Sequence, residues 1–473
     1  MAPPAQQMVE RGFGCRCPGA TVHVPGTMSV APRLRIQSTR PRDASAKPSG
    51  SDASAVVSIQ PGVIHTVNHC SCRKGRRYLA CALLICAAFA AVSVPMSARA
   101  QFTGNASATG QFESDSNVFA LESGFAQPGT SDFHRSDTFF AYGADFDGKY
   151  LWGRQELYAT AASKEYDYQR FTELSHNEYK VDAGLNWKLG ELLDGKLDIA
   201  RTRTMVPFFD LSGSALALSI VTEQRETAQI DMKLNSNWKV EGSGYASKAD
   251  EPLPAAPQLQ LTQSSGSASI DYLGITGLTS GLTAGYLSGN YSGSTATANP
   301  SFTQSTAGFL AKYKFSRTTI EGQVGYSRRV SDTGTDNTSG VTGMLDFTDQ
   351  LTPKTSFTAK IDRTINSYFL NTGSEIDTEA AASFRWQATY KLAVSPGYTF
   401  AYRDFPGQGN NPVGSNRVDI QEVVTLNIDY QPQRWLLIKP YASVQTRRST
   451  FIGAHYSAAI FGVSVTVTPY KPR

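Results

Sequence analysis

The sequence predicts an all-β protein: a transmembrane antiparallel β-barrel of about 18 strands, within a range of about 16–20. Polar and apolar side chains alternate in segment after segment from residue 101 onward. These segments run for about 10–13 residues, which matches a tilted strand that crosses a bilayer and exceeds the usual strand of about 5–6 residues. Long and short links alternate between them, as in barrels with long outer loops and short periplasmic turns.

Residues 179–189 show the alternation most clearly, because every odd position is apolar and every even position is polar or glycine. Successive side chains of a strand point to opposite faces, so such a segment has one apolar and one polar face. A soluble β-sandwich also alternates. The length of the segments, their consistent one-sidedness and the aromatic residues near their ends favour a membrane barrel. The pattern recurs in residues 228–235, 383–390, 424–430 and 461–468.

The links predict that both ends of the barrel domain lie on the periplasmic side. The first link is long and the last strand follows a long link, so an even number of strands begins and ends beside the short turns. The expected strands include 137–147, 150–163, 265–274 and 380–390, and the expected short turns are Asp147-Gly148-Lys149, Asn235-Ser236-Asn237, Ser316-Arg317 and Gln431-Pro432-Gln433.

Residues 73–100 are typical of a cleaved signal peptide. A positive region at 73–77 precedes a nearly continuous apolar run at 78–94, and Ala98 and Ala100 supply the small residues at positions −3 and −1. Cleavage is therefore predicted before Gln101, which leaves residues 101–473 as one barrel domain. A membrane anchor is the alternative, but the apolar run is shorter than the roughly 20 residues of a spanning helix.

Residues 1–72 form an unusual extension before the signal peptide. They are rich in Pro, Ser, Ala and Arg without periodicity, which predicts a disordered leader; our hypothesis is that its start codon is assigned too early. All six cysteines precede residue 101, and a cysteine-free body suits an oxidising periplasm. Residues 1–100 hold 12 Lys and Arg against 3 Asp and Glu, so the remaining chain is mildly acidic and has no basic face for nucleic acid.

Metal and cofactor chemistry is not expected. Cys70-Ser71-Cys72 lies near His65 and His69, but the spacing fits no common zinc pattern and the segment belongs to the discarded leader. The loop at 332–337 is polar enough to bind calcium weakly, and ordinary solvation of a loop explains it better.

Catalysis is not expected either. His455 and Ser457 lie two positions apart, so both side chains could share one strand face as a hydrolase pair. Ordinary polar residues beside the last loop are the better interpretation, and we expect no enzyme.

Charged residues on the polar strand faces are the candidates for the lining of a pore. They mix signs within single segments, which would create a transverse field suited to polar solutes, although any wet interior would carry such residues. The candidates are Lys180, Asp182, Lys188, Asp231, Lys233, Lys360, Asp362 and Arg385.

Asp115-Ser116-Asn117-Val118-Phe119 follows the first expected strand. Such an element soon after a cleaved signal peptide resembles the opening of the EpsL family, β-barrel porins of exopolysaccharide biosynthesis operons. The resemblance extends over residues 101–473 through the strand pattern, implies an outer-membrane barrel encoded with polysaccharide export genes, and brings no catalytic residues. The C-terminal aromatic of many such barrels is displaced here, because three residues follow Tyr470.

Together these features predict a passive pore in the outer membrane of a Gram-negative bacterium. It would contact outer-membrane lipid and pass exopolysaccharide or polar solutes supplied by periplasmic export machinery. The alternative is a structural or adhesive barrel whose outer loops bind surface polysaccharide, and an outer-membrane hydrolase is third.

Overall fold

The computed structural model describes residues 100–122, 134–208, 218–251, 259–292, 301–332, 337–368, 373–406, 417–451 and 453–469. The predicted leader and signal peptide (residues 1–99, with Ala98) and the aromatic residue Tyr470 lie outside these ranges. One short 3₁₀ helix, η2 (Thr172–Leu174), occurs in the described ranges, and none of their helices is long and apolar enough to cross a membrane.

The described residues form a single sheet of 18 strands. Their bounds are β1 Ala100–Asp115, β2 Asp137–Trp152, β3 Gln155–Tyr168, β4 His176–Leu189, β5 Leu193–Met205, β6 Ile220–Lys233, β7 Trp238–Glu251, β8 Leu259–Ile275, β9 Leu278–Ser292, β10 Phe302–Lys314, β11 Thr318–Ser331, β12 Thr338–Thr352, β13 Thr355–Tyr368, β14 Gly373–Thr389, β15 Leu392–Phe405, β16 Arg417–Gln433, β17 Leu436–Ser449 and β18 Tyr456–Val467.

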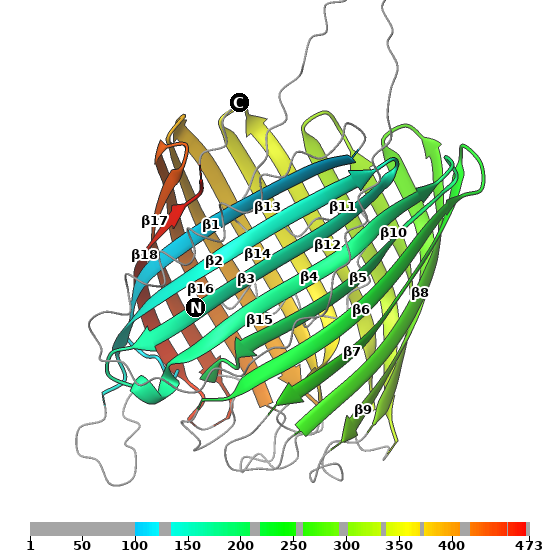
Figure 1. Ribbon diagram of the computed structural model, residues 1–473. Coiled ribbons are helices and arrows are strands. Elements are labelled where there is room, and N and C mark those ends of the chain that lie inside the picture. Colours follow the sequence, from blue (N-terminus) through cyan, green and yellow to red (C-terminus); the bar gives the residue numbers. More distant parts are fainter. Residues whose placement is uncertain are drawn as a thin grey trace, which may run out of the picture. The chain divides into compact units, whose positions relative to one another are not determined.

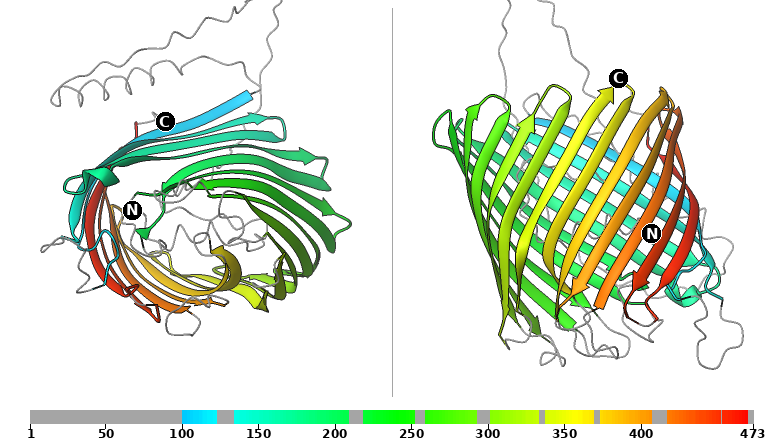
Figure 2. Two further views of the ribbon diagram at one scale, coloured as in Figure 1. Left: turned by 90° about the horizontal axis from the view of Figure 1, so that it is seen from below. Right: turned by 180° about the vertical axis from the view of Figure 1, so that it is seen from behind.

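The sheet closes on itself. Each strand pairs antiparallel with the next along the chain, and β1 pairs antiparallel with β18, from Ala108 opposite Val467 to Asp115 opposite Ile460. The strands run side by side at a steep tilt and surround a common centre (Figures 1 and 2). Closure pairs residues 108–115 of β1 with β18, so the sheet has no free edge there, while residues 100–107 pair with β2 only among the described strands. The predicted class, an antiparallel 18-stranded barrel, is confirmed.

The outer face of the barrel is apolar. Large side chains that would be buried in a soluble domain stand exposed on it, among them Leu282 (63%), Val341 (58%) and Phe461 (59%). Transfer of apolar surface out of water is worth about 25 cal/mol per Å². A belt of such residues around a closed barrel is therefore stable against lipid and costly in water.

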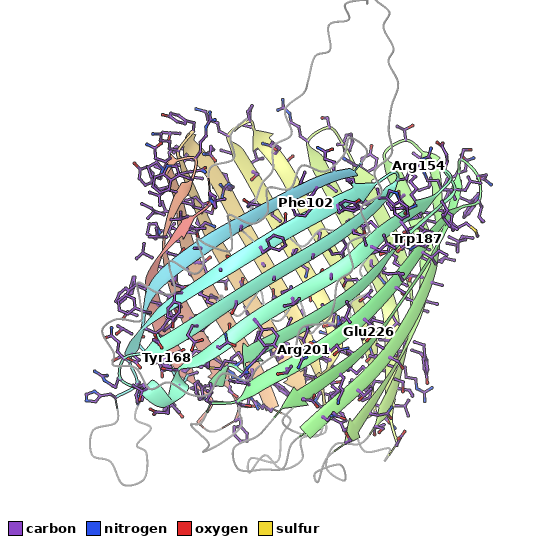
Figure 3. The ribbon with its side chains drawn as sticks, in the orientation of Figure 1. Phe102, Arg154, Tyr168, Trp187, Arg201 and Glu226 are labelled. Atoms are coloured by element: carbon purple, nitrogen blue, oxygen red, sulfur yellow. The ribbon has the colours of Figure 1, made fainter. Side chains whose placement is uncertain are left out.

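One predicted turn is wrong. Residues 147–149 lie inside β2, where Gly148 is opposite Gly104 of β1, and the turn between β2 and β3 falls at Gly153-Arg154 instead. The outward ring of Phe146 lies where a side chain on Gly148 would stand, so this glycine accommodates an aromatic neighbour rather than bending the chain. Arg154 marks the short-turn end of the barrel and Tyr168 the opposite, loop-bearing end (Figure 3).

The other predicted turns fall close to their places. Residues 235–237 and 316–317 link β6 to β7 and β10 to β11, while β16 continues through 431–433 and turns at Arg434-Trp435.

Several strands extend further toward the loop end than predicted. β8 begins at Leu259 rather than 265, and β14 begins at Gly373 rather than 380.

Candidate functional site: the lumen of the barrel

Strand register separates a lumenal from a lipid-facing set of side chains. On β4, Val181 belongs to the exposed apolar outer face, so Lys180, Asp182 and Lys188 share the lumenal face. Lys188 is opposite Asp194 of β5 in the register. These three predicted lining candidates therefore lie along one strand, on its inner side.

The remaining candidates lie on the lumenal faces of β6, β13 and β14. Lys360 Nζ is 3.0 Å from Asp362 Oδ1 on the same strand. Arg385 donates to Asp429 of β16 at 2.7 Å, which joins two strands separated by β15. Lys233 is opposite Lys239 of β7, a like-charge pair at the short-turn end.

Asp231 belongs to a larger cluster around Lys239. The Lys239 ammonium lies 3.3 Å from Asp231, 2.9 Å from Glu241 and 3.4 Å from Asp271, so one cation is shared by three carboxylates on three neighbouring strands. On β10 and β11, Lys312 and Glu321 form a further pair at 2.5 Å.

The sequence reasoning missed Glu241, Asp271 and Glu321. Asp271 is the only charged residue of β8, in a segment dominated by Ser and Gly, so it did not stand out as part of a charged face. Asp271 could have been found from its position, because it alternates with Ser267 and Ser269 along the strand and the three must therefore share a face.

A cavity of about 220 Å³ lies against the lumenal side of β7–β11. Small lumenal residues create it: Gly281 of β9 is opposite Asp271 on one side and Leu310 of β10 on the other, and a Cβ on Gly281 would collide with Asp271. The polar side chains that line the cavity are Lys239, Glu241, Ser243, Ser267, Ser269, Asp271, Thr279, Thr283, Lys312, Glu321 and Gln323.

A second polar network lies nearer the loop end, on β16 and β17. Arg417 binds Asp419 with its Nε (3.0 Å) and Nη2 (2.8 Å), and Arg447 and Ser449 also donate to the Asp419 carboxylate. Asp419 is 1% exposed. Both of its oxygens are satisfied, which is what makes a buried carboxylate tolerable.

The seam between the last and first strands is bridged from inside. Tyr441 of β17 passes over Gly462 of β18 and donates to Glu113 of β1. Gln111 donates to Glu113 at 2.9 Å and accepts a hydrogen bond from Lys164 of β3. These bonds connect strands on both sides of the seam.

The Asp115–Phe119 element continues this seam at the loop end. Ser116 N donates to the Ala459 carbonyl (3.0 Å), and Ala459 N donates to Ser116 Oγ (2.7 Å). The Asn117 side chain donates to the carbonyls of Leu121 (2.8 Å) and Ser457 (3.0 Å). The element therefore ties the end of β1 to the start of β18.

The side chains of Val118 and Phe119, the next two residues, are buried in an apolar cluster on the inner wall. The Phe119 ring lies 4.7 Å from that of Phe171 and 4.9 Å from that of Phe208, centroid to centroid. The buried residues of this cluster are Val118, Phe119, Leu121, Phe139, Ala141, Tyr166, Tyr168, Leu174, Met205 and Phe208. The geometry gives the element a structural task, anchoring the first loop.

The His455–Ser457 pair considered from the sequence is not joined by a hydrogen bond, and the described residues group no metal ligands. His455 Nδ1 accepts a hydrogen bond from Ser449 N at 3.4 Å, and no hydrogen bond joins it to Ser457. Within these ranges no three His, Cys, Asp or Glu side chains are grouped to hold a metal ion. Most of the polar loop at 332–337, which ordinary solvation explains better than weak calcium binding does, lies outside them, since 333–336 are not described.

A closed barrel with an apolar outer face and a charged lumen defines an outer-membrane β-barrel protein. No family model and no curated protein matches the chain. Solved structures with a similar fold include the outer membrane protein OpdK of Pseudomonas aeruginosa (10% identity over 78% of this chain and 99% of that one, TM-score 0.43) and OccK5 (OpdH) of the same species (12%, 78% and 98%, 0.42). The FrpB iron transporter of Neisseria meningitidis is also similar (12% identity over 73% of this chain, TM-score 0.43), but the match spans 62% of its length.

Proposed function

We propose that this protein is a passive outer-membrane pore that takes part in exopolysaccharide export, passing the polymer or other polar solutes through its lumen. The observation that carries the proposal is the lumenal face, where charged and hydroxyl side chains line strand after strand while the apolar side chains point outward. A polar wall of this kind binds water and offers partners to hydroxylated solutes.

The mixture of charges suits a polar polymer. Cations and carboxylates alternate across neighbouring strands, as in Lys239 with Asp271 and Lys312 with Glu321. Sugar hydroxyls donate to carboxylates and accept from ammonium groups, so a polysaccharide can exchange one set of partners for the next without a large barrier. The resemblance of Asp115–Phe119 to exopolysaccharide-operon porins supports the choice of polymer.

Single-channel conductance tests the proposal. The purified protein is reconstituted into a planar bilayer, with and without the exopolysaccharide of its host. We expect stable open steps that the polymer blocks. Steps indifferent to the polymer would restrict the function to that of a general porin.

Lack of conductance by the folded protein would overturn the pore and favour the adhesive barrel. The comparison that separates the two is a strain lacking the gene: loss of export indicates a pore, whereas normal export with loss of surface-bound polymer indicates adhesion.

A further inference from the structure

Two arginines lie on the outer face of β5, toward the loop-bearing end of the barrel. Arg201 and Arg203 occupy the same alternate positions of the strand as the exposed, lipid-facing Ile199, so their side chains also point away from the lumen. Figure 3 shows Arg201 beside Glu226 of the adjacent strand β6, well toward the loops. The apolar outer face of β5 therefore ends in two cations.

The two arginines lack a counter-charge within the described part of the chain. The outward carboxylates nearby bind other groups: Glu226 accepts a hydrogen bond from Gln224 at 3.2 Å, and Asp250 lies 3.9 Å from Lys248. The Nε atom of Arg203 has no hydrogen-bond partner among the described residues. An arginine beside lipid is costly unless it is paired, and a phosphate oxygen is a strong acceptor for it.

Lys248 of β7 adds a third cation to the same face. In the register, Arg201 and Lys248 are both opposite Gln224 of β6, one on each side, so their backbones lie about 10 Å apart. Arg201 and Arg203 are alternate residues of one strand, about 7 Å apart. The long side chains of these three residues, which we call the outer cationic patch, can therefore reach one anionic headgroup.

Apolar side chains adjoin the outer cationic patch. Val181 of β4 is opposite Arg201, and Ile199 precedes Arg201 on the same face of β5; both are about half exposed. They belong to the outer face that contacts the hydrocarbon of the membrane. Because the long loops of such barrels lie on the outer side, a ligand with an anionic head and an apolar body at this height is a lipid of the outer leaflet.

We propose that the outer cationic patch binds a phosphorylated glycolipid of the outer leaflet, whose phosphate monoester is bonded by Arg201 and Arg203 and whose acyl chains lie against the apolar outer face. A phosphate monoester carries a charge of about −1.5 to −2 and three acceptor oxygens, so it suits two guanidinium groups better than the single charge of a phosphodiester. The site lies outside the lumen, and it goes beyond the proposed function without depending on conduction.

Native mass spectrometry of the purified protein, delipidated in a nonionic detergent and titrated with three lipids, tests the proposal. The lipids are lipid A, its dephosphorylated form with the same acyl chains, and phosphatidylglycerol, whose phosphate is a diester. We expect lipid A to bind at least about tenfold more tightly than either of the others. Equal affinity for lipid A and its dephosphorylated form would overturn the proposal, and equal affinity for phosphatidylglycerol would contradict the choice of a glycolipid.

Variants assign the binding to the outer cationic patch. Arg201→Gln combined with Arg203→Gln should lower the affinity for lipid A about tenfold or more. The matched control combines Arg328→Gln on β11 with Arg448→Gln on β17, two outward arginines of other strands, of which Arg448 already pairs with Glu422 at 3.4 Å. This control removes the same charge and should leave the affinity unchanged.

An equal loss of affinity in the control would overturn the proposal, because binding would then reflect the general charge of the rim. An excess of inorganic phosphate supplies the charge without acyl chains; if it displaced lipid A completely, the patch would be a site for free anions and not for a lipid. Because the patch faces away from the lumen, the Arg201→Gln, Arg203→Gln variant should conduct like the unaltered protein. Failure of the lipid site therefore leaves the proposed pore intact.

Discussion

Two regions of the inner wall each hold buried carboxylates and differ in how many of the carboxylate oxygens receive a hydrogen bond. On β16 and β17, two arginines and a serine donate to Asp419, and both of its oxygens are satisfied. In the β7–β11 cavity, Asp271 and Glu321 each keep one oxygen without a donor among the described residues. Glycine and serine neighbours surround them, which leaves space instead of partners.

The difference teaches that polarity inside a barrel is not evidence of one role. A carboxylate with both oxygens bonded, such as that of Asp419, holds neighbouring strands together, because its removal would leave buried arginines without their counter-charge. In the cavity wall, by contrast, each carboxylate is held by one lysine through a single oxygen. The two regions should therefore respond differently to loss of a carboxylate, with a larger loss of stability in the first than in the second.

The largest effect on stability is expected from Asp419→Ala. The substitution leaves Arg417 and Arg447 buried without their carboxylate, at a cost of about 3–5 kcal/mol in the free energy of unfolding. Denaturant titration of the protein in lipid vesicles, followed by loss of β-sheet circular dichroism, measures it. The control is Asp145→Ala on β2, an exposed lumenal carboxylate. Equal losses in the two variants would show that the bonds to Asp419 contribute no more to the free energy of unfolding than an exposed lumenal carboxylate does.

A smaller loss is expected from Gly462→Ala at the seam. A Cβ there would overlap the ring of Tyr441 and displace its hydrogen bond to Glu113, at a cost of about 1–3 kcal/mol. Gly110→Ala on β1 serves as the control, because no atom lies within 4 Å of its added Cβ. The same titration compares them, and a harmless Gly462→Ala would mean that the seam does not depend on this bridge.

The smallest effect on stability is expected from Asp271→Asn. Lys239 keeps Asp231 and Glu241 as partners, and removal of one of three crowded carboxylates relieves repulsion, so the free energy of unfolding should change by less than about 1 kcal/mol. A loss as large as that of Asp419→Ala would erase the contrast between the two regions and make the cavity carboxylates structural.

Much of the fold could be predicted because lipid imposes a strict alternation on each strand. Residues 179–189 reveal the two faces of β4 without any knowledge of its neighbours. The turn at 147–149 was wrong because Gly148, which makes room for the ring of Phe146 two positions earlier on the same strand, looks like a turn glycine in sequence. Strand ends beyond the apolar belt, as at the start of β14, lack the alternation that would mark them.

The lumenal site was harder to predict because it depends on register between strands. Alternation indicates that Lys180 and Asp231 point inward, but only the stagger of β7, β8 and β11 brings Glu241, Asp271 and Glu321 to one cavity. Likewise, the Asp115–Phe119 element reads as a family signature in sequence, and its hydrogen bonds to β18, about 340 residues away, explain what it does in the fold.

The central claim is that one face of each strand borders water and the other borders lipid, and cysteine labelling tests it most directly. No native cysteine lies beyond residue 100, so Asp182→Cys and Val181→Cys each place one thiol in the barrel, on opposite faces of β4 at adjacent positions. The protein in lipid vesicles is treated with a charged, membrane-impermeant thiol reagent, and peptide mapping locates the label. We expect rapid labelling of Asp182→Cys and none of Val181→Cys. Equal labelling of both, or labelling of Val181→Cys alone, would contradict the account.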